Sequence, residues 1–197
     1  WTQTAGPYGG FVTAFGLNGT ILFAGTEGAG VFRSTDSGQN WTPASNGLTN
    51  RTIRAFTVNG TNLFAGTEGG GVYRSSDNGA NWTTSTLNNK TIYSISISGS
   101  YVYAGTWSTG VYVSTDNGSN WTQSAALGNK NIYSLAANGS NVFAGTQTLG
   151  VWASTNNGNS WTQSAINDKS VLSLALNGTN VFSGTDMNGL FKSSNYG

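Results

Sequence analysis

The stretch Ser114-Thr115-Asp116-Asn117-Gly118-Ser119-Asn120-Trp121 decides the fold, because its pattern S-x-D-x-G-x-x-W recurs along the whole chain. The tryptophans of this pattern lie 39 to 41 residues apart, at positions 1, 41, 82, 121 and 161. A Gly-Thr pair recurs with the same period, and a second glycine follows five residues after the first, as in Gly25 and Gly30. Five repeats of about 40 residues therefore cover residues 1–197. No linker interrupts them, so we expect a single domain.

Each repeat carries three runs with strand character and a short fourth. In the third repeat these are TIYSISI (91–97), YVYAG (101–105), GVYVS (110–114) and WTQS (121–124). They are rich in β-branched and aromatic residues and are bounded by Gly, Asn and Ser. Turns such as Asn59-Gly60 join the first two runs, and Asn-Gly is a strong hairpin signal. Four short antiparallel strands per repeat predict an all-β fold, a five-bladed β-propeller. A solenoid is the alternative.

The two ends of the sequence predict how the ring closes. The fifth repeat stops within the pattern, at Ser193-Ser194-Asn195-Tyr196-Gly197, and the chain begins with the tryptophan and short strand that would complete it. We therefore expect residues 1–4 to form the outer strand of the last blade, beside residues 190–194. Closure of this kind would leave no free sheet edge between the first and last repeats.

The repeated pattern has a physical explanation as a turn. Asp or Asn accepts N–H groups of its own turn, Gly supplies a positive φ, and Trp anchors the fourth strand. The alternative, that the aspartates ligate a metal or act as acids, is disfavoured by Asn156 and Asn195, since an amide carries no charge. The turn residues are Ser34, Asp36, Gly38, Trp41, Ser75, Asp77, Gly79, Trp82, Ser114, Asp116, Gly118, Trp121, Ser154, Asn156, Gly158, Trp161, Ser193, Asn195, Gly197 and Trp1.

These turns resemble the Asp-box, or BNR repeat, of the sialidase-like β-propeller superfamily, and the resemblance covers all five repeats. It implies that the boxes are structural and lie away from the active face. It also implies a sialidase site, with an arginine triad, a Tyr–Glu nucleophile pair and an Asp acid/base. This sequence lacks the catalytic pattern, because its four arginines (33, 51, 54 and 74) all lie in the first two repeats. We expect no enzymatic activity and no catalytic residues, although Glu27 and Glu68 leave a glycosidase pair as an alternative.

Composition excludes several classes of function. Only 8% of the residues are charged, against about 25% in ordinary domains, and the formal net charge is +1. There is no His and no Cys, which excludes Ser-His-Asp and Cys-His catalysis, zinc sites built on these ligands, and disulfides. We expect no cofactor, no metal and no nucleic-acid partner. No stretch is apolar enough to insert in a membrane.

Candidate binding residues are those at which equivalent positions of the repeats differ. The loops between second and third strands begin with Glu27, Glu68, Trp107, Gln147 and Asp186. Near the start of the first strands, Arg54, Tyr93 and Tyr133 occupy another varied position and are candidates to line a pocket. An exposed tryptophan among small polar residues suits stacking on a sugar ring, whereas Trp107 packed on a neighbouring blade is the structural alternative. For the tyrosines, that alternative is core packing with hydroxyls that reach solvent.

Three functions remain. The first is a non-enzymatic recognition module, a monomer that binds a glycan or a protein through the varied loops. The second is an engineered or excised repeat scaffold without a ligand, favoured by the similarity of the repeats. The third is sialidase-like hydrolysis, for which the sequence offers the least support. The content of Ser, Thr, Asn and Gly favours secretion or display at the cell surface.

Overall fold

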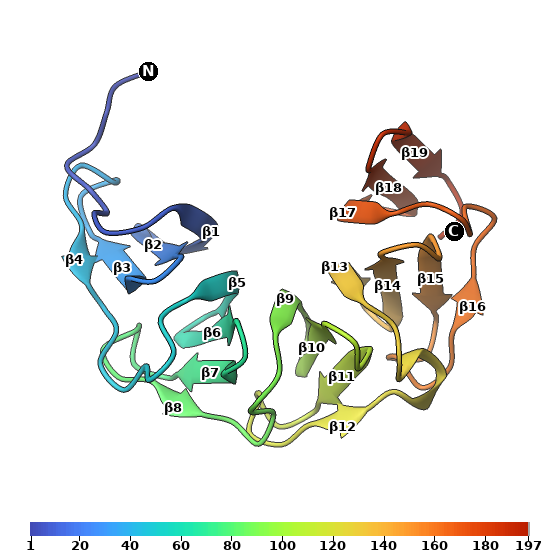
Figure 1. Cartoon of the computed structure of the whole chain (residues 1–197), viewed down its shortest axis with the longest axis horizontal. Coiled ribbons are helices and arrows are strands. Elements are labelled where there is room, and N and C mark those ends of the chain that lie inside the picture. The colour runs from blue at the N-terminus through green and yellow to red at the C-terminus, as the bar shows by residue number, and fades with distance from the viewer. Residues whose placement is uncertain (197) are drawn as a thin grey trace. The chain divides into compact units, whose positions relative to one another are not determined.

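The computed structural model describes residues 1–196 and confirms the all-β class (Figure 1). Within that range the strands form five antiparallel sheets, and the only helix is a short 3₁₀ turn at Ala125–Leu127. The chain divides into two compact units, Trp1–Ile92 and a second that begins at Tyr93. The number of sheets agrees with the five repeats of the sequence.

The first two strands of each sheet are its longest and form a hairpin. The first strands are β1 (Val12–Asn18), β5 (Ile53–Asn59), β9 (Ile92–Ser98), β13 (Ile132–Asn138) and β17 (Val171–Asn177). The second strands are β2 (Ile21–Thr26), β6 (Asn62–Thr67), β10 (Tyr101–Thr106), β14 (Asn141–Thr146) and β18 (Asn180–Thr185).

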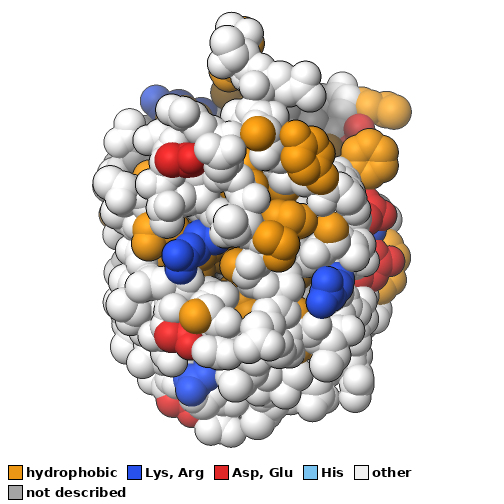
Figure 2. Space-filling view, turned by 90° about the vertical axis from the view of Figure 1, so that its left-hand side faces the viewer, with side chains coloured by type: hydrophobic (Ala, Val, Ile, Leu, Met, Phe, Trp, Pro, Cys, Tyr) orange, Lys and Arg blue, Asp and Glu red, His pale blue; other side chains and the backbone are white. Residues whose placement is uncertain are grey.

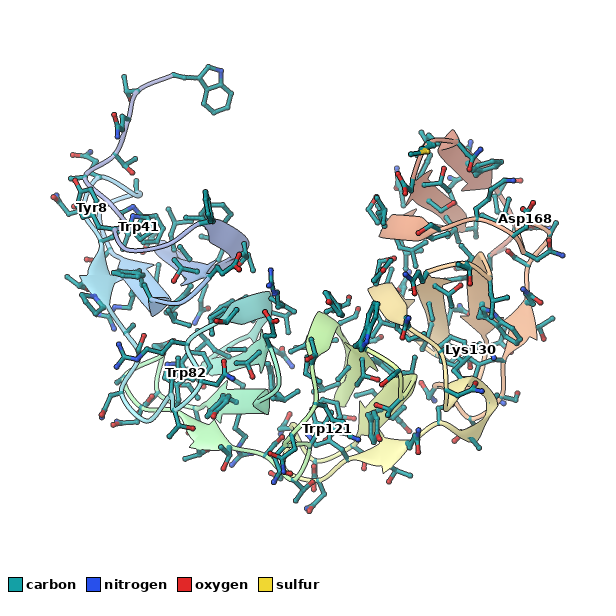
Figure 3. The ribbon with its side chains drawn as sticks, viewed as in Figure 1. Tyr8, Trp41, Trp82, Trp121, Lys130 and Asp168 are labelled. Atoms are coloured by element: carbon teal, nitrogen blue, oxygen red, sulfur yellow. The ribbon has the colours of Figure 1, made fainter. Side chains whose placement is uncertain are left out.

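The third and fourth strands are shorter. The third strands are β3 (Gly30–Ser34), β7 (Gly71–Ser75), β11 (Val111–Ser114), β15 (Val151–Ser154) and β19 (Gly189–Ser193). The fourth strands follow the tryptophans of the repeated turn and are β4 (Thr42–Pro43), β8 (Thr83–Thr84), β12 (Thr122–Gln123) and β16 (Thr162–Gln163). Figure 3 labels three of these tryptophans, Trp41, Trp82 and Trp121. Strand order within each sheet follows the sequence.

The hairpin turns differ in detail from the sequence expectation. Asn18 pairs with Ile21, so the two central residues of the turn are Gly19 and Thr20 rather than Asn-Gly. Gly19 has a φ of 59°, and a positive φ at the first central residue is the signature of a type II′ turn. The asparagine is therefore the last residue of the strand, and glycine alone supplies the left-handed conformation.

The Gly-Thr pairs allow successive sheets to approach closely. A Cβ added at Gly25 would lie 2.6 Å from Ile53 Cγ2, at the start of the next sheet, and one at Gly105 would lie equally close to Ile132 Cγ2. The threonine that follows closes the next loop, since Thr26 Oγ1 donates a hydrogen bond of 2.8 Å to Gly30 O. The spacing of the pair and the later glycine is thus set by one hydrogen bond.

Each unit has its own hydrophobic core between neighbouring sheets. In the first unit, Phe23, Ile53 and Leu63 are completely buried and Trp82 packs beside them. In the second unit, Tyr103 and Ile132 belong to one cluster, and a separate cluster is built on Phe143, Val151, Val171 and Val181. The alternation of apolar residues along the strands places these side chains on the faces between sheets.

Residues 1–4 form no strand, and Trp1 is fully exposed. Ala5 makes an isolated bridge to Asn40 instead. Among the described residues, the sheet β17-β18-β19 has three strands, and Gly197, which belongs to the split turn, lies outside the described residues. The predicted closure by residues 1–4 therefore stays a prediction.

Candidate functional site

In four of the five repeats the varied residue of the first strand lies at a β-bulge. The register of β13 with β14 shifts between Ile132 and Ser134, so Tyr133 is the extra residue. Arg54 in β5 and Leu172 in β17 occupy the same place in their sheets. Because a bulge redirects a side chain out of the regular ladder, each of these repeats presents one side chain here near the start of its first strand. These β-bulges therefore place the side chains of the candidate site.

In the first unit, the bulge residue Arg54 joins two carboxylates. Its Nε and Nη2 donate to Glu68 Oε2 at 3.1 and 2.5 Å, and Nη2 lies 3.4 Å from Glu27 Oε1. The glutamate side chains are about half exposed, at 45% and 50%, so solvent screens these ion pairs and each contributes little to stability. Three of the predicted binding residues thus form one ionic cluster.

In the second unit, three aromatic side chains pack together. The rings of Tyr93 and Tyr133 meet edge to face, with centroids 5.6 Å apart. Trp107 stacks on Tyr133, with centroids 6.2 Å apart, and contacts Tyr93 at 5.8 Å. The rings touch one another, so no ligand fits between them. Trp107 supports the two tyrosines while 41% of it remains exposed.

A pocket of about 390 Å³ opens beside this aromatic cluster. It is lined by Tyr93, Tyr133, Gln147, Ser170, Leu172 and Asp186. Burial raises the pKa of Tyr133, and the neighbouring Tyr93 and Asp186 raise it further, so this phenol is a neutral hydrogen-bond donor at physiological pH. The pocket combines two ring walls with hydroxyl, amide and carboxylate groups. No Lys or Arg side chain belongs to its described lining.

The eight predicted binding residues therefore separate into two groups. Arg54, Glu27 and Glu68 form the ionic cluster of the first unit. Of the remaining five, Tyr93, Tyr133, Gln147 and Asp186 line the pocket of the second unit, and Trp107 packs behind the two tyrosines. Sequence reasoning missed Asn131, whose Nδ2 donates to Gln147 Oε1. The available signal was the repeat alignment, because the equivalent residues are Phe11, Thr52, Thr91 and Ser170.

Two lysines that precede first strands, Lys130 and Lys169, have partners nearby. Lys130 lies 5.2 Å above the centre of the Trp152 ring, and Lys169 bonds Asp168 at 2.9 Å; Figure 3 labels Lys130 and Asp168. On the face drawn in Figure 2, Lys, Arg, Asp and Glu side chains are few and scattered. No group of three potential metal-ligating side chains occurs among residues 1–196. No helix in that range has the length and apolar character needed to cross a membrane.

The repeated S-x-[DN]-x-G turns are closed by their own hydrogen bonds. Ser34 Oγ donates to Asp36 Oδ1 at 2.8 Å and accepts from Gly38 N at 2.9 Å. Asp36 also accepts from the backbone and side chain of Asn40. In the fourth repeat, Asn156 Oδ1 accepts from Ser154 Oγ and Ser160 N in the same way. The amide thus reproduces the turn contacts of the carboxylate.

These hydrogen bonds predict acid sensitivity. Those from Asn40 and Ser34 lower the pKa of Asp36 from 3.8 to about 2, and equivalent contacts hold the pKa values of Asp77 and Asp116 at about 2. A pKa below its unfolded value means that the ionised form stabilises the fold. This stabilisation is complete above pH 4 and disappears as the pH falls through about 2.

We expect the triple variant D36N/D77N/D116N, with turns like that of Asn156, to lose less stability than the unmodified protein between pH 4 and pH 2. Urea denaturation at pH 2 to 6 measures the difference. Asp168, whose pKa is lowered by Lys169, is present in both proteins, so its contribution to the pH dependence of stability cancels in the comparison. Parallel pH curves for the two proteins would contradict the assignment.

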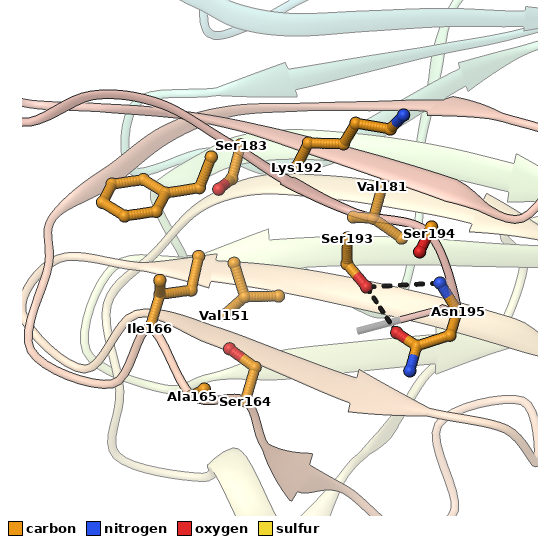
Figure 4. A pocket seen from close by; sticks show the side chains of 11 residues that line it. Val151, Ser164, Ala165, Ile166, Val181, Ser183, Lys192, Ser193, Ser194 and Asn195 are labelled. Carbon is orange, nitrogen blue, oxygen red and sulfur yellow. Dashed lines mark hydrogen bonds between the residues drawn. The ribbon is translucent and has the colours of Figure 1, made fainter.

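A second pocket, of about 470 Å³, lies along the third strand of the last sheet (Figure 4). Ser164 and Ser183 line it, and their Oγ atoms are buried without a hydrogen-bond partner in the described structure. One repeat earlier, Ser124 Oγ accepts from Trp161 Nε1 and donates to Gly158 O, both at 2.8 Å. The pocket therefore occupies the place of the tryptophan that would follow in a complete repeat.

The sequence matches no family model and no curated protein. Its fold is similar to the crystal structure of an ancestral GH74 enzyme, with a TM-score of 0.76 and 24% identity over 90% of this chain and 28% of the enzyme. It is also similar to the extracellular domain of a putative one-component system from B. thetaiotaomicron, with a TM-score of 0.79 and 20% identity over 98% of this chain and 28% of that one.

The computationally designed protein Ika4 is similar over 76% of this chain and 94% of its own length, with a TM-score of 0.64 and 13% identity. The chain spans only 28% of the length of the enzyme and of the extracellular domain. At these identities the similarity concerns the fold alone. The chain thus shares the repeated antiparallel sheets of propeller proteins, among which are an enzyme, an extracellular domain and a designed protein.

Proposed function

We propose that the chain is a non-enzymatic recognition module that binds a saccharide in the pocket of Tyr93, Tyr133, Gln147 and Asp186. The observation that carries the proposal is the combination of ring walls and hydrogen-bonding groups in one open pocket. Aromatic faces pack against the C–H surface of a sugar ring, while the amide and carboxylate bond its hydroxyls. Ligand sites typically combine apolar walls with a few directed polar groups.

The ionic cluster supports a non-enzymatic role. A glycosidase needs two carboxyl groups that flank the glycosidic bond and leave room for it between them. Glu27 and Glu68 instead share the guanidinium of Arg54, whose Nη2 contacts both carboxylates. We therefore assign Glu27 and Glu68 to the scaffold.

A glycan array followed by calorimetric titration tests the proposal. We expect saccharide binding by the unmodified protein, and a loss of affinity of at least about tenfold in Tyr133→Ala, since truncation of an aromatic anchor costs about 2 kcal/mol. Glu68→Ala, in the other unit, is the matched control and should bind normally. Circular dichroism confirms that both variants fold. Turnover of fluorogenic glycosides above background, or equal binding by both variants, would contradict the proposal.

The alternative function, a repeat scaffold without a ligand, is favoured by the similarity in fold to the designed protein Ika4. It predicts no binding on the array at any concentration. The array therefore separates the two functions directly.

We also propose that residues 1–197 form one five-bladed ring, closed by residues 1–4 beside β19. Three observations support this closure: the sequence Trp1-Thr-Gln-Thr4 resembles Trp161-Thr-Gln-Ser164, Ser164 Oγ lacks the tryptophan partner that Ser124 has, and β1 leaves Phe15 and Leu17 exposed. Their exposed fractions are 64% and 61%, whereas the equivalent Phe56 and Val58 pack on the core of the first unit.

A further inference from the structure

The orientation of the Asn131 side chain is fixed by a backbone group. Ser108 N, in the loop that carries Trp107, donates a hydrogen bond of 2.7 Å to Asn131 Oδ1. A backbone N–H can only donate, so the oxygen of the Asn131 amide must face Ser108 and its nitrogen must face the other way. The loop between β10 and β11 therefore determines which way this amide points.

The fixed amide in turn orients Gln147. Asn131 Nδ2 donates to Gln147 Oε1, and the backbone reinforces the pair, because Gln147 N donates to Asn131 O at 3.1 Å. Gln147 Nε2 has no partner among the described residues, and Gln147 lines the pocket. The pocket therefore presents an N–H donor from Gln147 and an acceptor from the Asp186 carboxylate.

We propose that Asn131 is a positioning residue that gives the pocket this polarity and so selects uncharged saccharides over sugar acids. The inference rests on the proposed function of the same pocket. A pair of sugar hydroxyls both accepts from Gln147 Nε2 and donates to Asp186. A sugar carboxylate meets the negative Asp186 with no Lys or Arg in the described lining. Burial without a matched partner is costly for a charge.

Asn131→Asp tests this assignment. One carboxylate oxygen would still accept from Ser108 N, and the other would force Gln147 to turn its Nε2 away from the pocket. The pocket would then present two acceptors. Asn129→Asp adds the same charge at an exposed neighbouring residue and is the matched control. Asn131→Thr introduces the residue found at the equivalent position of two other repeats, Thr52 and Thr91. It removes the relay, meaning the hydrogen bonds that join Ser108 to Gln147 through Asn131, without adding charge.

The probes are the methyl glycosides of glucose and galactose and their uronic acid counterparts, measured by titration calorimetry. We expect the unmodified protein to bind a neutral member at least about tenfold more tightly than its acid. Asn131→Asp should lose about tenfold in affinity, Asn131→Thr should also lose affinity, and Asn129→Asp should lose none. In a Gln147→Ala background, Asn131→Asp should have no further effect, because the two residues act as one unit.

Equal effects of Asn131→Asp and Asn129→Asp, additive effects with Gln147→Ala, or a preference for the uronic acid would overturn the assignment. A separate measurement distinguishes it from failure of the proposed function. The side-chain amide signals of Gln147 in a ¹⁵N spectrum should shift in Asn131→Asp and not in Asn129→Asp, with or without sugar. Shifted signals without saccharide binding would refute the saccharide site while the relay stands, and unshifted signals would refute the relay.

Discussion

Gly150→Ala is expected to destabilise the protein by more than about 4 kcal/mol, the range reserved for severe structural conflicts. Gly150 directly precedes β15 and has a φ of 66°. An added Cβ would overlap the carbonyl oxygen of Ile166. Gly150 also donates its N–H to Lys169 O at 2.9 Å and accepts from Thr146 Oγ1 at 2.8 Å. The three atoms nearest to the added Cβ are backbone atoms of Ile166 and Asn167, so no side-chain rotation relieves the clash.

Gly139→Ala is the matched control for this prediction. Gly139 has a similar φ of 59°, but nothing lies within 4 Å of an added Cβ. Its substitution should therefore cost only the left-handed conformation, roughly 1–2 kcal/mol. Urea denaturation of the two variants measures the difference in the free energy of unfolding. Equal destabilisation would show that backbone conformation alone, and not the close approach to Ile166, makes glycine necessary at position 150.

Deletion of residues 1–4 is expected to lower the melting temperature by roughly 10–20 °C, if closure buries Trp1 in the pocket of Ser164 and Ser183. Burial of one tryptophan removes about 150–250 Å² from water, worth roughly 4–6 kcal/mol at 25 cal/mol per Å². For a chain of this length, 1 kcal/mol corresponds to about 2–4 °C. Differential scanning calorimetry of the intact and shortened chains measures the shift.

Two variants sharpen the deletion experiment. Trp1→Ala should reproduce most of the loss, because its indole would be the partner of Ser164 Oγ. Gln3→Ala, which truncates another side chain of the same segment and keeps the tryptophan, should cause a small change. The loss should not depend on protein concentration, since closure lies within one chain. An unchanged melting temperature after deletion would contradict closure by residues 1–4.

The candidate site was only partly accessible from the sequence. Comparison of repeats found Tyr93, Trp107 and Tyr133, because these positions differ between copies that are otherwise alike. The comparison did not show that Arg54 belongs to a different cluster from these aromatic residues. An alignment of repeats shows which positions are equivalent, but it does not show which side chains are in contact. It also passed over Asn131, whose role depends on a backbone N–H from Ser108, 23 residues away in the sequence.

The sequence by itself determined the all-β class, the period and the number of sheets. These follow from local chemistry that each repeat carries within its own 40 residues: alternating apolar strands, glycines with positive φ, and turns such as Ser34–Trp41 that close on themselves. Only the tertiary structure decided which varied residues form a pocket and which form an ion cluster. Bulges that aim Arg54 and Tyr133 arise from pairing between strands, and the polarity of Gln147 from contacts between successive sheets.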